Sequence, residues 1–390
     1  MDSGPTAIQD CLNRIDELDP DIQAWTQLAR EDALKQAGQA NGPLAGVPFG
    51  VKDIFDTAGM PTEWGTVVQK GRIPTEDAAL VARLKELGAV VLGKTHTTAF
   101  AYFDPAPTRN PKDLDHTPGG SSSGSAAAVA AGMVPFALGS QTQGSVLRPA
   151  SFCGIVGWKP TFGTLPLAGV MPFAPSLDHA GILVRSVADL IEIWEALTGP
   201  VAGTSASSIT VLDWPIEGQL EPAMARAFED SIGKLAETFE IVEAPTPDSF
   251  KALPAATATI MTYEAAQFHG AMLRDHGPAI GSKLAALIEN GLAIDESAYR
   301  EAKSSVDIAK AKFVDWSKQH RVVATPAALG PAPRGLESTG DPRCSIPWTT
   351  LGAPAISVPM PTNGLPLGLQ LTAGYGSEAT LLQTAQKIED

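Results

Sequence analysis

The sequence predicts an α/β fold. Amphipathic stretches with a helical period alternate with short, wholly apolar runs, which is typical of helices and strands layered around a common core. At 390 residues the chain is long enough to bury a sizeable core, in one large domain or two smaller ones. No apolar run reaches the roughly 18 residues that a membrane helix requires, so no membrane partner is expected.

The first 40 residues are predicted to form a helical wrap on the main body. Residues 7–18 place apolar side chains at a helical period that ends at Asp19-Pro20. Residues 24–40 are predicted as a second helix, with Gly42-Pro43 as its stop.

Helices and strands are then predicted in alternation. The strands are residues 47–51, 89–92, 133–138, 209–212, 241–242, 322–325, 355–359 and 368–372. The helices are residues 75–87, 126–132, 186–197, 221–239, 255–271, 280–290, 297–318 and 377–388. We find no internal repeat and no clear linker, so residues 1–390 are predicted to be a single domain, with residues 245–248 as the alternative seam.

Charge and cysteine content exclude several classes of function. A net charge of −15 argues against nucleic acid or an anionic membrane as a general partner, although a single arginine can still bind an anionic substrate. The three cysteines are far apart and odd in number, and residues 1–10 have no leader pattern, so a reducing, cytoplasmic location is expected. The six histidines are scattered without metal-ligand spacing, so no metal and no cofactor are predicted.

The most informative stretch is residues 117–160. A Gly/Ser cluster at residues 119–125 precedes the small-residue helix, whose free N–H groups favour an anion or an oxyanion. A second polar loop follows at residues 139–145, so two loops close around one helix. The alternatives are a flexible linker, which the composition alone would suggest, and a phosphate cradle, which lacks the Gly-Lys-[Ser/Thr] ending of a P-loop.

In this order of residues the chain resembles the amidase signature family. Matching blocks cover most of the chain and lie at residues 42–56, 93–95 with 108–111, 117–160, 176–178 with 185–190, and 356–370. The resemblance implies a central mixed β-sheet covered by helices on both faces. It also implies that residues 42–200 carry the catalytic motifs and residues 201–390 the rest of the sheet and its covering helices.

The resemblance also implies a Ser–cis-Ser–Lys triad. Ser145 matches the nucleophile, and Ser121, which lies 24 residues earlier, matches the bridging serine whose preceding peptide bond is cis. Lys52 matches the base. A lysine among apolar neighbours has a lowered pKa and can act as a base, whereas the alternative is a solvated lysine at a strand end. Further implied are an oxyanion hole of backbone N–H groups from Thr142, Gln143, Gly144 and Ser145, and substrate binding at Gly119 and Gly120.

Two positions depart from the commonest family pattern. The usual Asp-Thr-Gly-Gly-Ser is here Gln141-Thr142-Gln143-Gly144-Ser145, which requires at Gln143 a backbone angle open to a residue with a Cβ atom. The arginine often found two residues after the nucleophile lies three after it, as Arg148. In this respect the loop looks like malonamidase, which implies that Arg148 binds a substrate carboxylate.

Each of these assignments has an alternative. Arg148 is equally compatible with a structural salt bridge to Asp53 or Asp178. The adjacent Asp178 and His179 resemble parts of a Ser–His–Asp triad, but neighbouring side chains in one loop rarely relay a proton to each other. Cys153 is predicted to be a small core residue.

We therefore expect an amide hydrolase that uses an acyl-enzyme intermediate, without metal or cofactor, on a small-molecule C–N substrate that carries a carboxylate if Arg148 binds one. One alternative is the glutaminase subunit of a tRNA-dependent amidotransferase, which usually has the Asp-Thr-Gly-Gly form and a longer chain. The other is a non-catalytic binding module on the same scaffold. No nucleic-acid or membrane partner is expected, and a homodimer is left open.

Overall fold

A single mixed β-sheet of eleven strands runs through the computed structural model, which describes residues 1–213 and 219–390. The strand order is β1-β3-β2-β4-β6-β5-β10-β11-β9-β7-β8, with parallel pairs around β2 and β7 and antiparallel pairs elsewhere. The strands are β1 (Trp25–Leu28), β2 (Pro48–Lys52), β3 (Val90–Thr95), β4 (Phe136–Gln141), β5 (Val156–Lys159), β6 (His179–Val184), β7 (Ser208–Asp213), β8 (Glu240–Pro245), β9 (Val322–Pro326), β10 (Ala355–Met360) and β11 (Leu367–Ala373).

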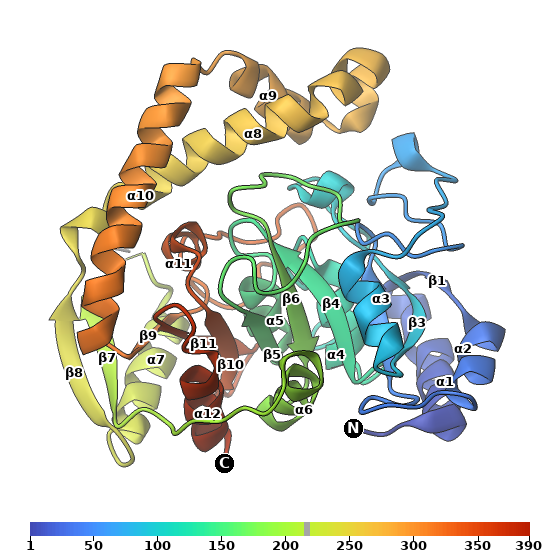
Figure 1. The fold of residues 1–390 in the computed structure, drawn as a ribbon, viewed down its shortest axis with the longest axis horizontal. Helices are drawn as coiled ribbons and strands as arrows, with labels where there is room; N and C mark the ends of the chain where they lie inside the picture. The colour runs from blue at the N-terminus through green and yellow to red at the C-terminus, as the bar shows by residue number, and fades with distance from the viewer. Residues whose placement is uncertain (214–218) are drawn as a thin grey trace.

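Helices cover both faces of this sheet (Figure 1). Buried apolar side chains form two separate clusters, a large one that includes α3, α6 and α8 and a smaller one that includes α1, α2 and α4. The described α-helices are α1 (Gly4–Ile22), α2 (Arg30–Ala37), α3 (Ala79–Glu86), α4 (Ser123–Ala130), α5 (Leu147–Cys153), α6 (Val187–Thr198), α7 (Pro222–Leu235), α8 (Leu253–His276), α9 (Ser282–Leu292), α10 (Glu296–Gln319), α11 (Ile346–Leu351) and α12 (Glu378–Glu389). The predicted α/β fold with a covered mixed sheet is confirmed.

The prediction for the first 40 residues is wrong in one respect. Helix α1 continues through Pro20 to Ile22, and the chain then forms strand β1 where a helix was predicted. Strand β1 pairs antiparallel with β3 and extends the sheet by one edge strand. A four-residue edge strand has too few residues to show a period, and its Trp and Thr suit a pleated surface. Only α2 remains of the second predicted helix.

Several elements near the centre of the sheet were not predicted. Strand β4 starts three residues later than expected and continues to Gln141, so the polar loop before Ser145 is shorter than the sequence suggested. Helix α5 and strands β5 and β6 follow, and β6 lies between β4 and β5 in the sheet. These elements are short and fully buried, so they lack the alternation that reveals a half-exposed element.

Helices α8, α9 and α10 extend past one end of the sheet (Figure 1). Helices α8 and α10 hold the segment before β6 by hydrogen bonds, since Glu264 of α8 accepts from the backbone N–H of Ser176 at 2.8 Å. Lys303 of α10 donates to the Ser176 hydroxyl at 2.7 Å. Strand β8, which ends at the predicted seam, belongs to the same sheet, and the assignment of the chain to one domain stays a prediction. Within the described residues, no helix is both long and apolar enough to cross a membrane.

Candidate active site

Lys52 is the last residue of β2 and is completely buried. Its Nζ lies 2.7 Å from the Oγ atoms of Ser121 and Ser140, and 3.1 Å from that of Ser122. Burial holds the pKa of Lys52 well below its ordinary value, and the Asp178 carboxylate only partly opposes this shift. The expectation of a buried lysine with a lowered pKa is thus met, and the alternative of a solvated strand-end lysine is wrong. The role of Lys52 as the base stays a prediction.

Ser121 lies in the loop that leads into α4, directly after a cis peptide bond between Gly120 and Ser121. The resemblance implied a cis bond at this place. The helix that follows is built from small residues because it packs against backbone. A Cβ atom on Gly124 would lie 2.2 Å from the carbonyl oxygen of Ala24 and 2.4 Å from the nitrogen of His96. The small-residue run therefore lets the Gly/Ser loop approach Lys52.

The loop before Ser145 is held at both ends by the side chain of Gln141. The Oε1 atom of Gln141 accepts hydrogen bonds from the backbone N–H groups of Val146 at 2.9 Å and Leu147 at 3.0 Å. Its Nε2 donates to the hydroxyl of Thr349, which in turn donates to the carbonyl of Gln143 at 2.8 Å. The glutamine that replaces Asp at position 141 thus accepts hydrogen bonds from one end of the loop and holds the other end through Thr349.

The backbone N–H groups of Thr142, Gln143, Gly144 and Ser145 donate to no protein acceptor in the part of the chain that the structure describes. Gln143 is not among the four described non-glycine residues with positive φ, so its Cβ atom is accommodated without strain. The Thr142 hydroxyl donates to Asp178 at 2.6 Å, which fixes one side of the loop. The four N–H groups remain free to bind an oxyanion.

Ser145 is half-buried and lines a cavity together with Ser121 and Arg148. In the described residues its hydroxyl has no hydrogen bond to Ser121, so the relay implied by the resemblance is not closed in this structure. Such contacts in a ligand-free enzyme are often long and tighten only when substrate binds. The structure therefore brings Lys52 and Ser121 into contact and places Ser145 beside them.

Arg148 lies in α5 and is 2% exposed. Its Nε donates to the carbonyl of Thr339 and its Nη2 to the carbonyl of Gly120, both at 2.7 Å, and Nη2 also lies 3.3 Å from the Thr339 hydroxyl. Burial lowers the pKa of Arg148 to about 10, although the Asp341 carboxylate opposes the shift. Among the described residues Nη1 has no hydrogen-bond partner.

This geometry corrects the alternative for Arg148. The guanidinium forms no salt bridge with Asp53 or Asp178, whose carboxylates accept from backbone N–H groups instead. Neutral oxygens already accept from Nε and Nη2, so only Nη1 is free for the substrate carboxylate that the resemblance implies. The open donor is Nη1, which would lie 3.1 Å from a Cβ atom on Gly144, so a larger residue there would crowd it.

The remaining predicted residues take structural positions. Gly119 has a φ of +82°, and its carbonyl accepts from the Ser123 hydroxyl, while the Gly120 carbonyl accepts from Arg148. Substrate binding by these two glycines stays a prediction. Nδ1 of His179 pairs with the carbonyl of Leu177, and no hydrogen bond joins His179 to Asp178 in the described chain. Cys153 is fully buried in the smaller apolar cluster, as predicted.

The family assignment follows from a comparison with known proteins. The model of the Amidase family matches residues 6–382. The chain belongs to the amidase family. It is therefore an amidase-signature hydrolase by sequence, and its fold agrees with that of solved members.

Relatives in this family cover almost the whole chain. One is a subunit of the glutamyl-tRNA(Gln) amidotransferase of Moorella thermoacetica, 34% identical over 97% of this chain and 91% of its own length. A solved amidase is 30% identical with a TM-score of 0.91, over 99% of this chain and 96% of its own. Another solved structure, described as a vestigial protein complex that reveals the origins of an s-triazine catabolic enzyme, is 29% identical with a TM-score of 0.91, over 100% and 95% of the two chains.

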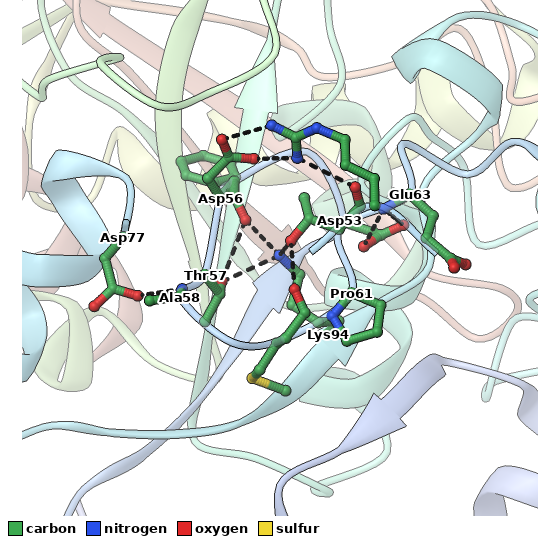
Figure 2. A network of polar contacts seen from close by, with 12 residues as sticks. Asp53, Asp56, Thr57, Ala58, Pro61, Glu63, Asp77 and Lys94 are labelled. Atoms are coloured by element: carbon green, nitrogen blue, oxygen red, sulfur yellow. Dashed lines mark hydrogen bonds and ion pairs between the residues drawn. The ribbon is translucent and has the colours of Figure 1, made fainter. Parts of the chain in front are cut away.

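A second buried lysine, missed by the sequence analysis, stabilises the segment that follows β2 (Figure 2). Lys94 of β3 is paired in register with Val51, so the alternation of side chains places Lys94 and Lys52 on opposite faces of the sheet. The Lys94 ammonium donates to the carbonyl of Phe55 and to the hydroxyls of Thr57 and Thr62. Burial lowers its pKa to about 8, against the opposing charge of Asp53. In this family member one lysine is thus structural and the other faces the serines.

Other residues missed from the sequence belong to the site itself. The Oγ atom of Ser140 lies 2.7 Å from Lys52 Nζ, as near as that of Ser121. The Oγ atom of Ser122 lies slightly farther away, at 3.1 Å. Ser140 lies at the fifth position of β4, which the sequence analysis had placed in a loop. If β4 had been predicted to reach Ser140, the side chain of Ser140 could have been placed near the neighbouring strand β2.

Proposed function

We propose that this protein is an amide hydrolase that acts on a small C–N substrate through an acyl-enzyme intermediate. The observation that carries the proposal is the fully buried Lys52, whose pKa is lowered and whose Nζ lies 2.7 Å from Ser121 Oγ. A lysine in this setting can be neutral and accept a proton. In this proposal Ser145 is the nucleophile, Ser121 the relay and Lys52 the base.

The reaction uses each group in turn. Neutral Lys52 takes a proton from Ser121, which takes the proton of Ser145 as its oxygen attacks the amide carbon. The carbonyl oxygen becomes an anion and is bound by the free N–H groups of residues 142–145. The proton returns through Ser121 to the leaving amine, the C–N bond breaks, and water then hydrolyses the ester on Ser145 by the same path.

Arg148 supports a substrate with a carboxylate. The hydrogen-bond partners of this buried guanidinium are all neutral, and the Asp341 carboxylate acts on it only through space. Because a buried charge without a direct partner is costly, the free Nη1 favours an anionic ligand. Nη1 is beside the nucleophile loop, since Arg148 and Ser145 line the same cavity. We therefore include an acidic group near the scissile amide in the proposed substrate.

The second candidate is the glutaminase subunit of a tRNA-dependent amidotransferase. It is favoured by the 34% identity to the glutamyl-tRNA(Gln) amidotransferase relative. Gln141 and Gln143 argue against it, because the loop departs from the Asp-Thr-Gly-Gly that is usual in such glutaminases. Copurification of partner chains, together with activity that requires tRNA, would favour this candidate over a free-standing amidase.

Covalent labelling tests the proposal. A sulfonyl fluoride should add its mass to the peptide that contains Ser145, and the Ser145→Ala variant should not be labelled. Ser151, which is buried in α5 of the same loop region, provides a matched control, since Ser151→Ala should still be labelled. Labelling that persists in Ser145→Ala would show a different nucleophile, and no labelling of the native protein would favour a non-catalytic binding module.

A further inference from the structure

An apolar chamber adjoins the cavity that holds Ser145. The space open to the centre of a water molecule is about 350 Å³ in the chamber but only about 20 Å³ over Ser145. The cavity over Ser145 therefore has room for a narrow group, and a bulkier part of a ligand has to lie elsewhere. The chamber is lined by Ile54, Ala101, Ser140, Thr142, Leu167, Val170, Met171, Pro172, Phe173, Pro175 and Asp178.

The polar side chains of the chamber wall already have hydrogen-bond partners within the protein. The Ser140 hydroxyl is bonded to Lys52, and the Thr142 hydroxyl donates to Asp178. The second carboxylate oxygen of Asp178 accepts from the backbone N–H groups of Phe173 and Ala174 at 2.8 and 2.9 Å. A polar group would lose its water here without gaining hydrogen bonds from these side chains, whereas an apolar group would gain from leaving water.

The chamber is next to the reacting centre. Ala101, Thr142 and Phe173 line both spaces, so the two share a wall that includes one residue of the oxyanion loop. Arg148 lines only the cavity over Ser145. A substrate whose amide lies over Ser145 can thus place a charged group toward Arg148 and another group past Phe173.

The outer wall of the chamber is fixed by α8 and α10. Glu264 accepts from Ser176 N at 2.8 Å and from the Tyr299 hydroxyl at 2.7 Å, and Lys303 donates to the Ser176 hydroxyl at 2.7 Å. These bonds hold the segment that carries Pro175 and Phe173. A wall fixed in this way can select ligands by size, since it does not expand freely.

We propose that this chamber receives a compact apolar group of the substrate, about the size of a phenyl ring or a branched alkyl chain. The inference rests on the proposed amide hydrolysis at Ser145, to which it adds a substrate class. The chamber is large enough for such a group, because pockets for small ligands start at roughly 300 Å³ and an apolar cavity of about 150 Å³ already holds benzene.

Filling the chamber tests the proposal by kinetics. The substrates are propanamide, 3-phenylpropanamide and N-benzylacetamide, the last two with the ring on opposite sides of the amide. Leu167→Trp should lower kcat/KM for at least one phenyl amide about 10- to 100-fold more than for propanamide, because the ring loses its buried position. Val170→Phe is a second filling variant of the half-buried wall and should act in the same direction. Leu197→Trp, at a half-buried position of α6 away from both cavities, should leave the ratio unchanged.

Binding separates this inference from the proposed function. Calorimetry on Ser145→Ala should detect at least one phenyl amide, and the double variant with Leu167→Trp should bind it at least about tenfold more weakly. If the native protein cleaves no amide but this binding is found, the proposed hydrolysis is wrong and the chamber stands. The chamber is not an apolar substrate site if neither phenyl amide binds, or if Leu167→Trp lowers kcat/KM for all three amides equally.

Discussion

The Nζ atom of Lys52 lies 2.7 Å from Ser121 Oγ on a face of the sheet where hydroxyl groups, not carboxylates, are its hydrogen-bond partners. Lys94, on the opposite face, has the Asp53 carboxylate to raise its pKa against burial. Burial lowers the pKa of Lys52 as well, against the opposing charge of Asp178, and so favours the neutral amine that a proton-accepting lysine requires.

Replacement of Lys52 is the first test. Lys52→Ala should lower kcat/KM by about 10²- to 10⁴-fold, since it removes the group that accepts the proton of the nucleophile. His179→Ala should have little effect on the activity of the folded protein, because His179 contacts Leu177 and the ring of Phe162 instead of the serines. Steady-state kinetics on both variants, with folding checked by circular dichroism, decides whether Lys52 or His179 is needed for activity. A larger loss in His179→Ala would contradict the Ser–Lys assignment.

The pH dependence of activity should have an acidic limb from Lys52. The reaction needs the neutral amine, so kcat/KM should fall about tenfold per pH unit once the pH drops below the pKa of Lys52 in the folded protein. Because burial holds that pKa well below the ordinary 10.5, this acidic limb should also lie well below pH 10.5. A profile of kcat/KM against pH checks this, and activity that rises as the pH falls would rule out lysine as the base.

Stability should respond to the same group. The unfolded lysine keeps its proton up to a pH near 10.5, whereas the folded one loses it at a lower pH. Between these two pKa values the unfolded state binds more protons, so the free energy of unfolding increases with pH in that window, by at most about 1.4 kcal/mol per pH unit. Lys52→Met should flatten this slope in urea titrations. An unchanged slope would mean that other groups cause it.

The side chain of Gln141 should matter through the loop that it holds. Gln141→Ala leaves the buried N–H groups of Val146 and Leu147 without their acceptor, which we expect to cost about 1–3 kcal/mol in stability. Since these groups follow Ser145 directly, kcat should fall more than KM changes. Thr349→Val removes the hydroxyl that accepts from Gln141 Nε2 and donates to the Gln143 carbonyl, but leaves the bonds from Val146 and Leu147 to Gln141 in place, so it should give a smaller loss of kcat. The comparison of kcat and KM for both variants tests this order.

The sequence was sufficient for the residues whose neighbours along the chain reveal them. Lys52 follows an apolar run, and Ser121 and Ser145 lie in Gly/Ser loops beside a small-residue helix, but only the motifs shared with the amidase signature family assign all three to one site. Contacts made across the sheet could not be predicted in this way. The strand pairing of β1, the partners of Lys94 and the bond from Gln141 to Thr349 join residues that are far apart in the chain, and only the folded register brings them together.

The last prediction concerns Arg148 and a carboxylate. Arg148→Ala should weaken the turnover of an acidic amide by about 2–4 kcal/mol in the transition state, as expected when one partner of a desolvated charge pair is lost. A neutral amide of similar size should lose far less. Because Nη1 is the free donor and the other nitrogens hold Gly120 and Thr339, the clamp on the substrate is a single charge-assisted contact.

Lysine at this position separates charge from geometry. Arg148→Lys keeps a positive charge but cannot hold Gly120 and Thr339 while it also reaches the substrate, so it should recover only part of the loss. Thr339→Val, which removes just the 3.3 Å hydroxyl contact, serves as the matched control and should change the ratio of acidic to neutral turnover little. If Arg148→Ala reduces the turnover of acidic and neutral amides equally, Arg148 only supports the loop that carries Gly120, and the preference for a carboxylate has no basis in this site.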